Sequence, residues 1–399
     1  MAKKSVEDVQ VQGKRVFVRA DLNVTFKPKT TEIADDSRIR ATLPTISYLK
    51  ERGAKIILCS HLGRPGGKVQ EEARLTPIAR RLSELLSVKV PLAPDCIGPE
   101  VERLVQAMRP GDILLLENVR FHPEEEKNDP AFAKELASLA DIYVNDAFGT
   151  AHRAHASTEG IAHHVPAVAG LLMKKEIESL TAAVASPKRP FAALLGGAKV
   201  TDKIAMLENL LPMVDRLLIG GGMAAAFLKA YGHEVGTSLL ENGDEQKARD
   251  VVKAAARRGK VEVLLPLDVV VTDKIDKDAR GEVVFSDKIP ADKMMVDIGP
   301  RTVDMFRKAV RDAKTVVWNG PMGVFEYEPF AQGTYGMAKA LAEATDAGAF
   351  TVTGGGSTAE AIDKLGLADR IRLVSTGGGA TLEFLEGKVL PGIAALMEK

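Results

Sequence analysis

The segment Phe350–Gly356, FTVTGGG, joins a short apolar and β-branched run directly to three glycines. Such a run predicts a buried strand, and the glycines let backbone N–H groups approach a phosphate without obstruction from a Cβ atom. The same junction recurs at Leu217–Gly222 (LLIGGG) and Arg372–Gly379 (RLVSTGGG), and a fourth, Ala192–Val200 (AALLGGAKV), adds Lys199. Four strand-to-glycine junctions in one half of the chain predict a nucleotide or polyphosphate site there.

Strand-like and helix-like segments alternate along the whole chain, which favours an α/β fold with largely parallel sheets. At 399 residues the chain exceeds one ordinary core, so we expect about two or three domains. The pattern predicts strands near residues 15–19, 55–60, 112–117, 141–145, 191–195, 216–219, 262–265, 315–318, 350–352 and 372–375. It predicts helices near residues 76–86, 130–140 and 171–185, the last of which divides the two halves.

Composition narrows the class of protein. Lysine plus arginine (54) equals aspartate plus glutamate (54), so no basic field predicts nucleic-acid binding. The two cysteines, Cys59 and Cys96, have no C-x-x-C spacing, and neither a disulfide framework nor a zinc knuckle is expected. The N-terminus has no apolar signal region, and no run approaches 18 apolar residues. We therefore expect a cytoplasmic protein that does not enter a membrane.

In the first half of the chain, the predicted strands end in cationic and polar groups instead of glycines. Ligands of open parallel sheets bind beyond the carboxyl ends of the strands, and arginine suits carboxylate and phosphate groups. The candidates for such a pocket are Arg19, Arg38, His61, Arg64, Arg120 and Arg153. Strand alternation could turn Arg19 away from the ligand.

Eight blocks of the sequence together resemble the signature blocks of phosphoglycerate kinases. They are RADLNV, SHLGRP, LLLENVRFHPEE, GTAHRAH, LLGGAKVTDK, GGGMA, WNGPMGVFE and STGGGATLEFLEGKVLPG, in that order. The resemblance implies two doubly wound α/β domains with mostly parallel sheets, facing each other across a cleft and joined by a connecting helix. Residues 1–170 would bind 3-phosphoglycerate, with the tail 388–399 packed back on them, and residues 171–387 would bind the nucleotide.

The resemblance also implies a reaction: reversible phosphoryl transfer between 1,3-bisphosphoglycerate and ADP, giving 3-phosphoglycerate and ATP. Charge stabilisation and domain closure would drive it without a covalent intermediate. Because the attacking carboxylate is ionised near neutral pH, no general base is required. Mg²⁺ would enter with ATP or ADP, and the family's usual state implies a monomer.

The site residues that the resemblance implies fall into three groups. The substrate-binding residues are Asp21, Leu22, Asn23, Arg38, His61, Leu62, Gly63, Arg64, Arg120 and Arg153. The nucleotide-binding residues are Lys203, Asn319, Glu326, Gly355, Gly356, Ser357 and Thr358. The catalytic residues are Arg38, Lys199, Lys203, Gly377 and Gly378. The four-residue spacing of Lys199 and Lys203 predicts that both project from one helix face.

Position 357 departs from the family pattern. The glycine loop of the family usually continues with an aspartate that contacts Mg²⁺, whereas this chain has Ser357. A neutral hydroxyl is a poorer ligand for a hard cation, so the residue that holds Mg²⁺ is not assigned. The histidines at 152, 155, 163 and 164 could suggest a metal site, but their H-x-x-H spacing lacks cysteine or paired acidic ligands, so no structural metal is expected there. We expect the acidic run 123–130 to be a solvated loop and helix start instead of paired catalytic carboxylates.

Two other functions compete with the kinase. A dinucleotide-dependent dehydrogenase would also carry glycine loops after strands, but no G-x-G-x-x-G follows the first strand. A non-catalytic binding protein with a degenerate site is supported by Ser357 alone. The sequence has no P-loop motif, G-x-x-x-x-G-K-[ST]. An assay with ATP, Mg²⁺ and 3-phosphoglycerate would separate these alternatives.

Overall fold

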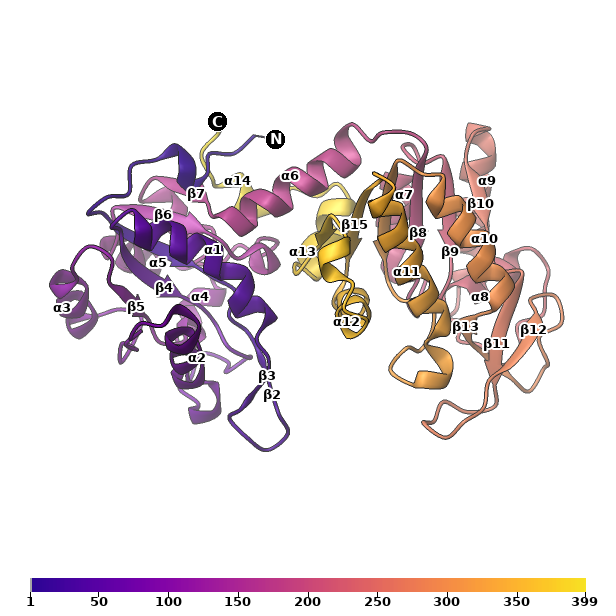
Figure 1. The fold of residues 1–399 in the computed structure, drawn as a ribbon, viewed down its shortest axis with the longest axis horizontal. Coiled ribbons are helices and arrows are strands. Elements are labelled where there is room, and N and C mark those ends of the chain that lie inside the picture. The colour runs from indigo at the N-terminus through magenta and orange to yellow at the C-terminus, as the bar shows by residue number, and fades with distance from the viewer. Residues whose placement is uncertain (1) are drawn as a thin grey trace. The chain divides into compact units, whose positions relative to one another are not determined.

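The computed structural model describes residues 2–399, which form two compact units (Figure 1). Unit 1 runs to Glu178 and includes Val389–Lys399, and unit 2 is Ser179–Lys388. Helix α6 (Leu171–Ala185) passes from one unit into the other, so the division between the units runs through it. Across residues 2–399, no helix has the length and apolar character needed to cross a membrane.

Unit 1 is built on a five-stranded sheet in the order β5-β4-β1-β6-β7, and every neighbouring pair is parallel. The winding starts at the central β1, proceeds outward through β4 to β5, and then reverses to β6 and β7. The reversal places a crevice between the ends of β1 and β6, where ligands of open α/β sheets bind. The strands are β1 (Arg15–Arg19), β4 (Lys55–Cys59), β5 (Ile113–Leu115), β6 (Ile142–Asn145) and β7 (Ala167–Ala169).

The helices of unit 1 bury the apolar side chains of this sheet. Val16, Val18 and Ile56 on one face pack with Ile46 of α1 and Leu82 of α2 in a single core cluster. Besides α1 (Ser37–Glu51) and α2 (Thr76–Leu86), the unit contains a small antiparallel pair, β2 (Thr25–Phe26) with β3 (Ile33–Asp35), and the helices α3 (Pro99–Ala107), α4 (Pro123–Glu126), α5 (Pro130–Ser138) and α14 (Pro391–Ala394).

The C-terminal segment completes unit 1. Asn145 at the end of β6 donates a side-chain hydrogen bond to the carbonyl oxygen of Gly392 (3.1 Å), and the Lys4 amide donates to the carbonyl oxygen of Met397 (2.8 Å). Figure 1 accordingly shows the two ends of the chain close together on this unit. Unit 1 is thus assembled from the first 178 and the last 11 residues.

Unit 2 repeats the same winding with one more strand. Its six-stranded sheet has the order β10-β9-β8-β14-β15-β16, again parallel throughout, and the reversal lies between β8 and β14. The strands are β8 (Phe191–Leu195), β9 (Arg216–Ile219), β10 (Glu262–Leu264), β14 (Thr315–Asn319), β15 (Phe350–Gly354) and β16 (Leu373–Val374).

The core of unit 2 lies between this sheet and its helices. Val316 and Trp318 of β14 pack with Phe306 of α10 and Leu341 of α11, all of them fully buried. The helices are α7 (Ile204–Leu210), α8 (Ala224–Ala230), α9 (Asp244–Arg258), α10 (Pro300–Arg311), α11 (Gln332–Asp346), α12 (Gly356–Lys364) and α13 (Gly379–Leu385). The expected α/β class with mostly parallel sheets is confirmed.

A three-stranded antiparallel sheet in unit 2 was not predicted. It has the order β12-β11-β13 and consists of β11 (Asp268–Thr272), β12 (Glu282–Phe285) and β13 (Met294–Ile298). Val283 and Phe285 of β12 are about half exposed, so the strand lacks the buried, alternating pattern on which the sequence prediction relied.

Candidate substrate and nucleotide sites

The reversal point of unit 1 gathers most of the expected cationic residues. Arg19 is the last residue of β1 and its side chain is fully buried, so strand alternation does not turn it to solvent. Its guanidinium donates to the Ser157 hydroxyl (2.8 Å) and lies 3.1 Å from Nδ1 of His61. Because a guanidinium can only donate, Nδ1 of His61 must accept, and the ring proton is on Nε2.

His61 is therefore a neutral hydrogen-bond donor. Burial holds its pKa well below the usual range, and the charges of Arg19, Arg120, Arg38 and Arg153 add to that effect. Arg19 contacts the imidazole directly, and the charges of all four arginines act on it, so we treat them as one group. We call Arg19, Arg38, His61, Arg120 and Arg153 the arginine cluster.

Arg120 is the least compensated member of the cluster. It follows β5 in the turn Val119–Phe121 and is 3% exposed. One guanidinium nitrogen donates to the Gly63 carbonyl oxygen (2.8 Å), whereas Nε and the other terminal nitrogen are buried without a hydrogen-bond partner. Nε lies 3.2 Å from the Glu126 carboxylate, outside hydrogen-bond geometry. Burial lowers the pKa of Arg120 to about 10, so this position favours a bound anion.

The remaining expected substrate residues frame this cluster. The Asp21 carboxylate accepts from Arg38 with both oxygens at 3.0 Å, and the Asn23 side chain accepts from the Gly63 amide (2.8 Å). Leu22 and Leu62 are buried, which anchors the loops that follow β1 and β4. Arg64 is exposed, and its side chain makes no hydrogen bond or ion pair within residues 2–399; it follows Gly63, whose carbonyl oxygen accepts from Arg120.

One residue of the acidic run contradicts the sequence prediction. Glu125 in α4 is fully buried rather than solvated. Its carboxylate accepts from the Ser157 hydroxyl (2.6 Å) and the Ser157 amide (2.8 Å), and Ser157 in turn binds Arg19. Burial raises the pKa of Glu125, and the Arg19 charge opposes that rise. Sequence alone could not show that this glutamate faces inward to balance Arg19.

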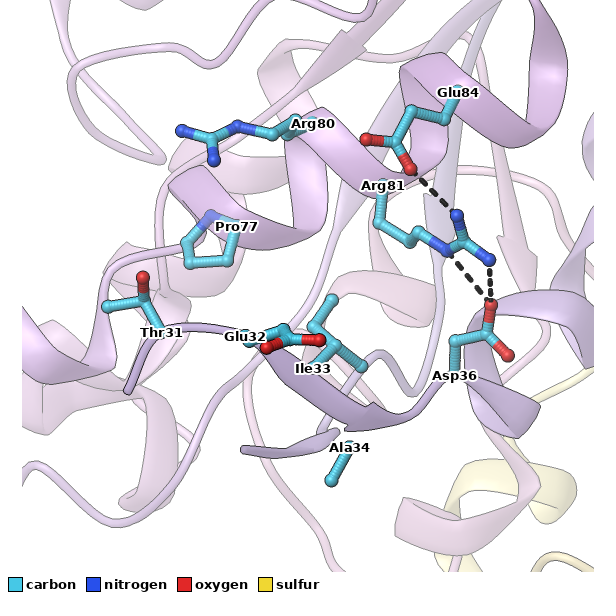
Figure 2. Close-up of a pocket in the computed structure, with 9 residues that line it drawn as sticks. All are labelled: Thr31, Glu32, Ile33, Ala34, Asp36, Pro77, Arg80, Arg81 and Glu84. Atoms are coloured by element: carbon cyan, nitrogen blue, oxygen red, sulfur yellow. Dashed lines mark hydrogen bonds and ion pairs between the residues drawn. The ribbon is translucent and has the colours of Figure 1, made fainter. Parts of the chain in front are cut away.

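A pocket elsewhere in unit 1 also contains arginines, but they are paired differently (Figure 2). It has a volume of about 490 Å³ and lies between β3 and α2. Arg81 in this pocket donates to Asp36 (2.8 and 2.9 Å) and to Glu84 (2.7 Å), so its charge is satisfied within the chain. Figure 2 shows Arg80 directed away from this group. Arginines are thus present in both places, but among the described residues the buried guanidinium nitrogens that make no hydrogen bond belong to Arg120 of the cluster.

In unit 2, a cavity of about 520 Å³ lies at the reversal point. The loops after β8, β14 and β15 and the first turn of α12 form its walls. It contains two lysines and one carboxylate, that of Asp202. The lining residues are Gly197, Ala198, Lys199, Asp202, Lys203, Asn319, Gly320, Pro321, Gly355, Gly356, Ser357, Thr358 and Leu382.

The amides at the start of α12 give this cavity an anion-binding wall. The helix begins at Gly356 after Gly355, whose φ of 96° is reserved for glycine. The Thr358 hydroxyl accepts from the Gly320 amide (2.9 Å) and holds the loop after β14 against the helix. Free N–H groups at a helix start favour a phosphate group.

Close backbone contacts hold the glycine loops in place. A Cβ atom at Gly196 would lie 2.2 Å from the Pro321 carbonyl oxygen, and one at Gly320 would lie 2.3 Å from the Gly196 carbonyl oxygen. The Gly220–Gly222 loop is part of this packing, since a Cβ atom at Gly221 would lie 2.5 Å from the Gly197 nitrogen. That loop is therefore structural, and it does not line the cavity.

The two lysines occupy different settings, which corrects the prediction that they share a helix face. Lys199 lies before the first helical turn, Thr201–Lys203, because the chain after Gly197 is still irregular there. It pairs with Glu241, which raises its pKa. Lys203 donates to the Asn319 side chain, and burial lowers its pKa. Both lysines nevertheless line the cavity.

Three expected residues of unit 2 do not line this cavity. Glu326 is exposed in the loop that follows β14. Gly377 and Gly378 precede α13, and the Gly377 amide donates to the Ser375 hydroxyl (3.1 Å). Asp202 lines the cavity but was not among the expected residues. Its position directly before Lys203 in the sequence could have indicated that it lies near the site.

Comparison with known proteins identifies the family. The sequence model of phosphoglycerate kinase matches residues 6–388. The chain belongs to the phosphoglycerate kinase family. It is 55% identical to phosphoglycerate kinase of Moorella thermoacetica over the full length of both chains. It is also 55% identical to the chloroplastic phosphoglycerate kinase of Volvox carteri, matching 87% of that protein.

Solved structures of the same family agree. A phosphoglycerate kinase of Coxiella burnetii is 44% identical, with a TM-score of 0.88 and 98% of each chain covered. That of Pyrococcus horikoshii OT3 is 36% identical, with a TM-score of 0.83 and the same coverage. Our chain is a kinase of glycolysis that transfers a phosphoryl group reversibly between 1,3-bisphosphoglycerate and ADP, as the sequence resemblance predicted.

Proposed function

We propose that the arginine cluster of unit 1 binds the phosphoglycerate and that the cavity of unit 2 binds the nucleotide. The observation that carries the first assignment is Arg120, which has two buried guanidinium nitrogens that make no hydrogen bond. A carboxylate or phosphate oxygen would satisfy these donors, and Nε2 of His61 offers one more. For the second assignment, the α12 amides and Lys203 supply the contacts that polyphosphate requires.

Phosphoryl transfer then needs mainly positioning and charge stabilisation. The substrate carboxylate oxygen bonds to the γ-phosphorus of ATP while the bond to the ADP oxygen breaks, so the two ligands must meet during turnover. We assign Arg38, Lys199 and Lys203, with the amides of Gly377 and Gly378, to neutralise the moving group. For Gly377 this requires its amide to leave the Ser375 hydroxyl.

Magnesium would enter with the nucleotide. The cavity offers oxygen donors that suit a hard cation, namely the Asp202 carboxylate and the Ser357 hydroxyl. We propose that Asp202 takes the part that aspartate usually plays at position 357. When bound, Mg²⁺ would offset the charge of the phosphate groups.

Ligand binding to single variants tests the two assignments separately. Arg38→Ala or Arg120→Ala should weaken binding of 3-phosphoglycerate and leave ATP binding unchanged, whereas Lys203→Ala should do the reverse. Calorimetric titration of each of the three purified variants with each of the two ligands gives the six values required. Equal losses for both ligands in any variant would refute the division of labour.

We further propose that the chain works in the cytoplasm as a monomer without a nucleic-acid partner. The balance of 54 basic and 54 acidic residues supports the last point, and two free buried cysteines fit a reducing compartment. Light scattering at assay concentration should give the mass of one chain, and a dimer mass would refute the monomer.

A further inference from the structure

Three side chains that commonly bind transition metals converge in unit 1 outside the arginine cluster. Asp95 and Cys96 lie in the loop before α3, and His122 lies between the Val119–Phe121 turn and α4. One ligand atom from each lies within 4.8 Å of the other two. Asp95 and His122 are 27 residues apart in sequence, so folding alone brings them together.

Contacts with the rest of the chain hold these three residues in place. Nε2 of His122 lies 2.7 Å from Oδ1 of Asp95, and the same oxygen accepts from the Cys96 amide (2.6 Å). The imidazole stacks on Phe132, with ring centroids 5.2 Å apart and planes inclined by 28°. The Glu117 amide donates to the Asp95 carbonyl oxygen (3.3 Å). The ligand atoms are thus largely preorganised.

The three residues lie at the edge of the buried core. Cys96 is fully buried, whereas Asp95 and His122 are partly exposed, so the ligand atoms can be reached from solvent.

The donor set selects the class of metal. Thiolate and imidazole suit zinc and its relatives, whereas Mg²⁺ prefers six oxygen ligands. One thiolate and one carboxylate would offset the two charges of such an ion, so the loaded site would carry no net charge. Three protein ligands leave one tetrahedral position for water.

We propose that Asp95, Cys96 and His122 form a binding site for one divalent cation of the zinc class. The metal replaces the thiol proton of Cys96, and also the ring proton of His122 when that ring is charged, so each leaves as H⁺. No change of oxidation state is involved. Because His122 is two residues past Arg120, the bound ion would tie the Asp95–Cys96 loop to the segment that carries Arg120.

Cobalt substitution tests the site without relying on activity. The full-length protein, freed of metal with a chelator and kept free of nucleotide, is titrated with Co²⁺ at mildly alkaline pH. We expect one equivalent to bind, with a near-ultraviolet sulfur-to-cobalt absorption band and the visible bands of tetrahedral cobalt. Zn²⁺ should abolish the bands at one equivalent, and excess Mg²⁺ should leave them intact.

Single substitutions test each of the three proposed metal ligands. Cys96→Ser should remove the sulfur band, and Asp95→Asn and His122→Gln should each weaken Co²⁺ binding at least tenfold. Cys59→Ser tests the other buried thiol and should keep the band. His163→Gln alters an exposed histidine that pairs only with Glu159, and should also keep it.

Two results would overturn the proposal. One is a wild-type protein that shows no thiolate band with Co²⁺, which does not depend on the folding of any variant. The other is a band that survives Cys96→Ser in a protein with unchanged circular dichroism, or that disappears in Cys59→Ser instead.

Discussion

The parallel sheets of the two units share a strand order but carry different chemistry where the winding reverses. In unit 1 the buried Arg19 and Arg120 lie at or after the carboxyl ends of strands, and Arg120 has two guanidinium nitrogens that make no hydrogen bond. In unit 2 a cavity at the reversal is lined by glycine loops, the first turn of α12 and two lysines. The same order of parallel strands therefore carries arginine side chains in unit 1, and mainly backbone amides together with two lysines in unit 2. Buried arginines suit carboxylate and phosphate groups, and amides at a helix start suit a phosphate chain.

Of the substitutions that test this difference between the units, Arg120→Ala is expected to have the largest effect on activity. Removing a charge that contacts the substrate should lower kcat/KM for 3-phosphoglycerate about a hundredfold while KM for ATP stays unchanged. Arg81→Ala is the matched control, because Arg81 is already paired with Asp36 and Glu84, and its kcat/KM should fall less than about twofold. Steady-state kinetics with each substrate varied in turn measures both.

The free energy of unfolding tests whether Arg120 serves binding or the stability of the fold. Arg120→Met replaces an incompletely paired buried charge by an apolar chain of similar length, so the free energy of unfolding should not decrease. A clear loss of stability together with a normal KM for 3-phosphoglycerate would make Arg120 a structural residue and break the comparison.

Gly196→Ala tests whether unit 2 depends on its backbone packing. The new Cβ atom would lie 2.2 Å from the Pro321 carbonyl oxygen, and relieving this clash should cost about 2 kcal/mol of unfolding free energy. Trp318, the single tryptophan, is buried in unit 2, so its fluorescence in urea reports on that unit. Gly356→Ala, which meets no atom within 4 Å, should leave the urea midpoint unchanged. Equal midpoints for the two variants would contradict the packing account.

Lys203→Ala should lower kcat at least tenfold with the fold intact, whereas Lys199→Ala should lower it about threefold. The difference arises because Lys203 is held by Asn319 inside the cavity, while Lys199 shares its charge with Glu241. Turnover of both purified variants under saturating substrates gives the ratio. The reverse order would show that the exposed lysine is the one that acts on the phosphoryl group.

Ser357→Asp should have the smallest effect. A carboxylate beside the first turn of α12 should lower the Mg²⁺ concentration for half-maximal rate a few-fold. Asp202→Asn should raise that concentration if Asp202 holds the ion now. Titration of Mg²⁺ at fixed ATP measures both, and unchanged values in both variants would exclude these residues as metal contacts.

The strand-and-glycine pattern was sufficient to predict the α/β class and most of the parallel strands, because buried parallel strands are short, apolar and sharply ended. It was not sufficient for β12, whose apolar side chains face solvent. At the site level, motif resemblance predicted His61, Arg120 and Lys203, but not which hydrogen bonds they make. Glu125 could not be distinguished from neighbouring acidic residues, since its burial depends on contacts distant in sequence.

The path of the chain has a consequence for synthesis. Because Val389–Lys399 complete unit 1, the ribosome must finish all of unit 2 before the first unit can close. Asn145 is synthesised 247 residues before Gly392, whose carbonyl oxygen accepts its side-chain hydrogen bond. The unit that begins first is thus finished last, and unit 1 stays incomplete in the nascent chain until its C-terminal segment has been made.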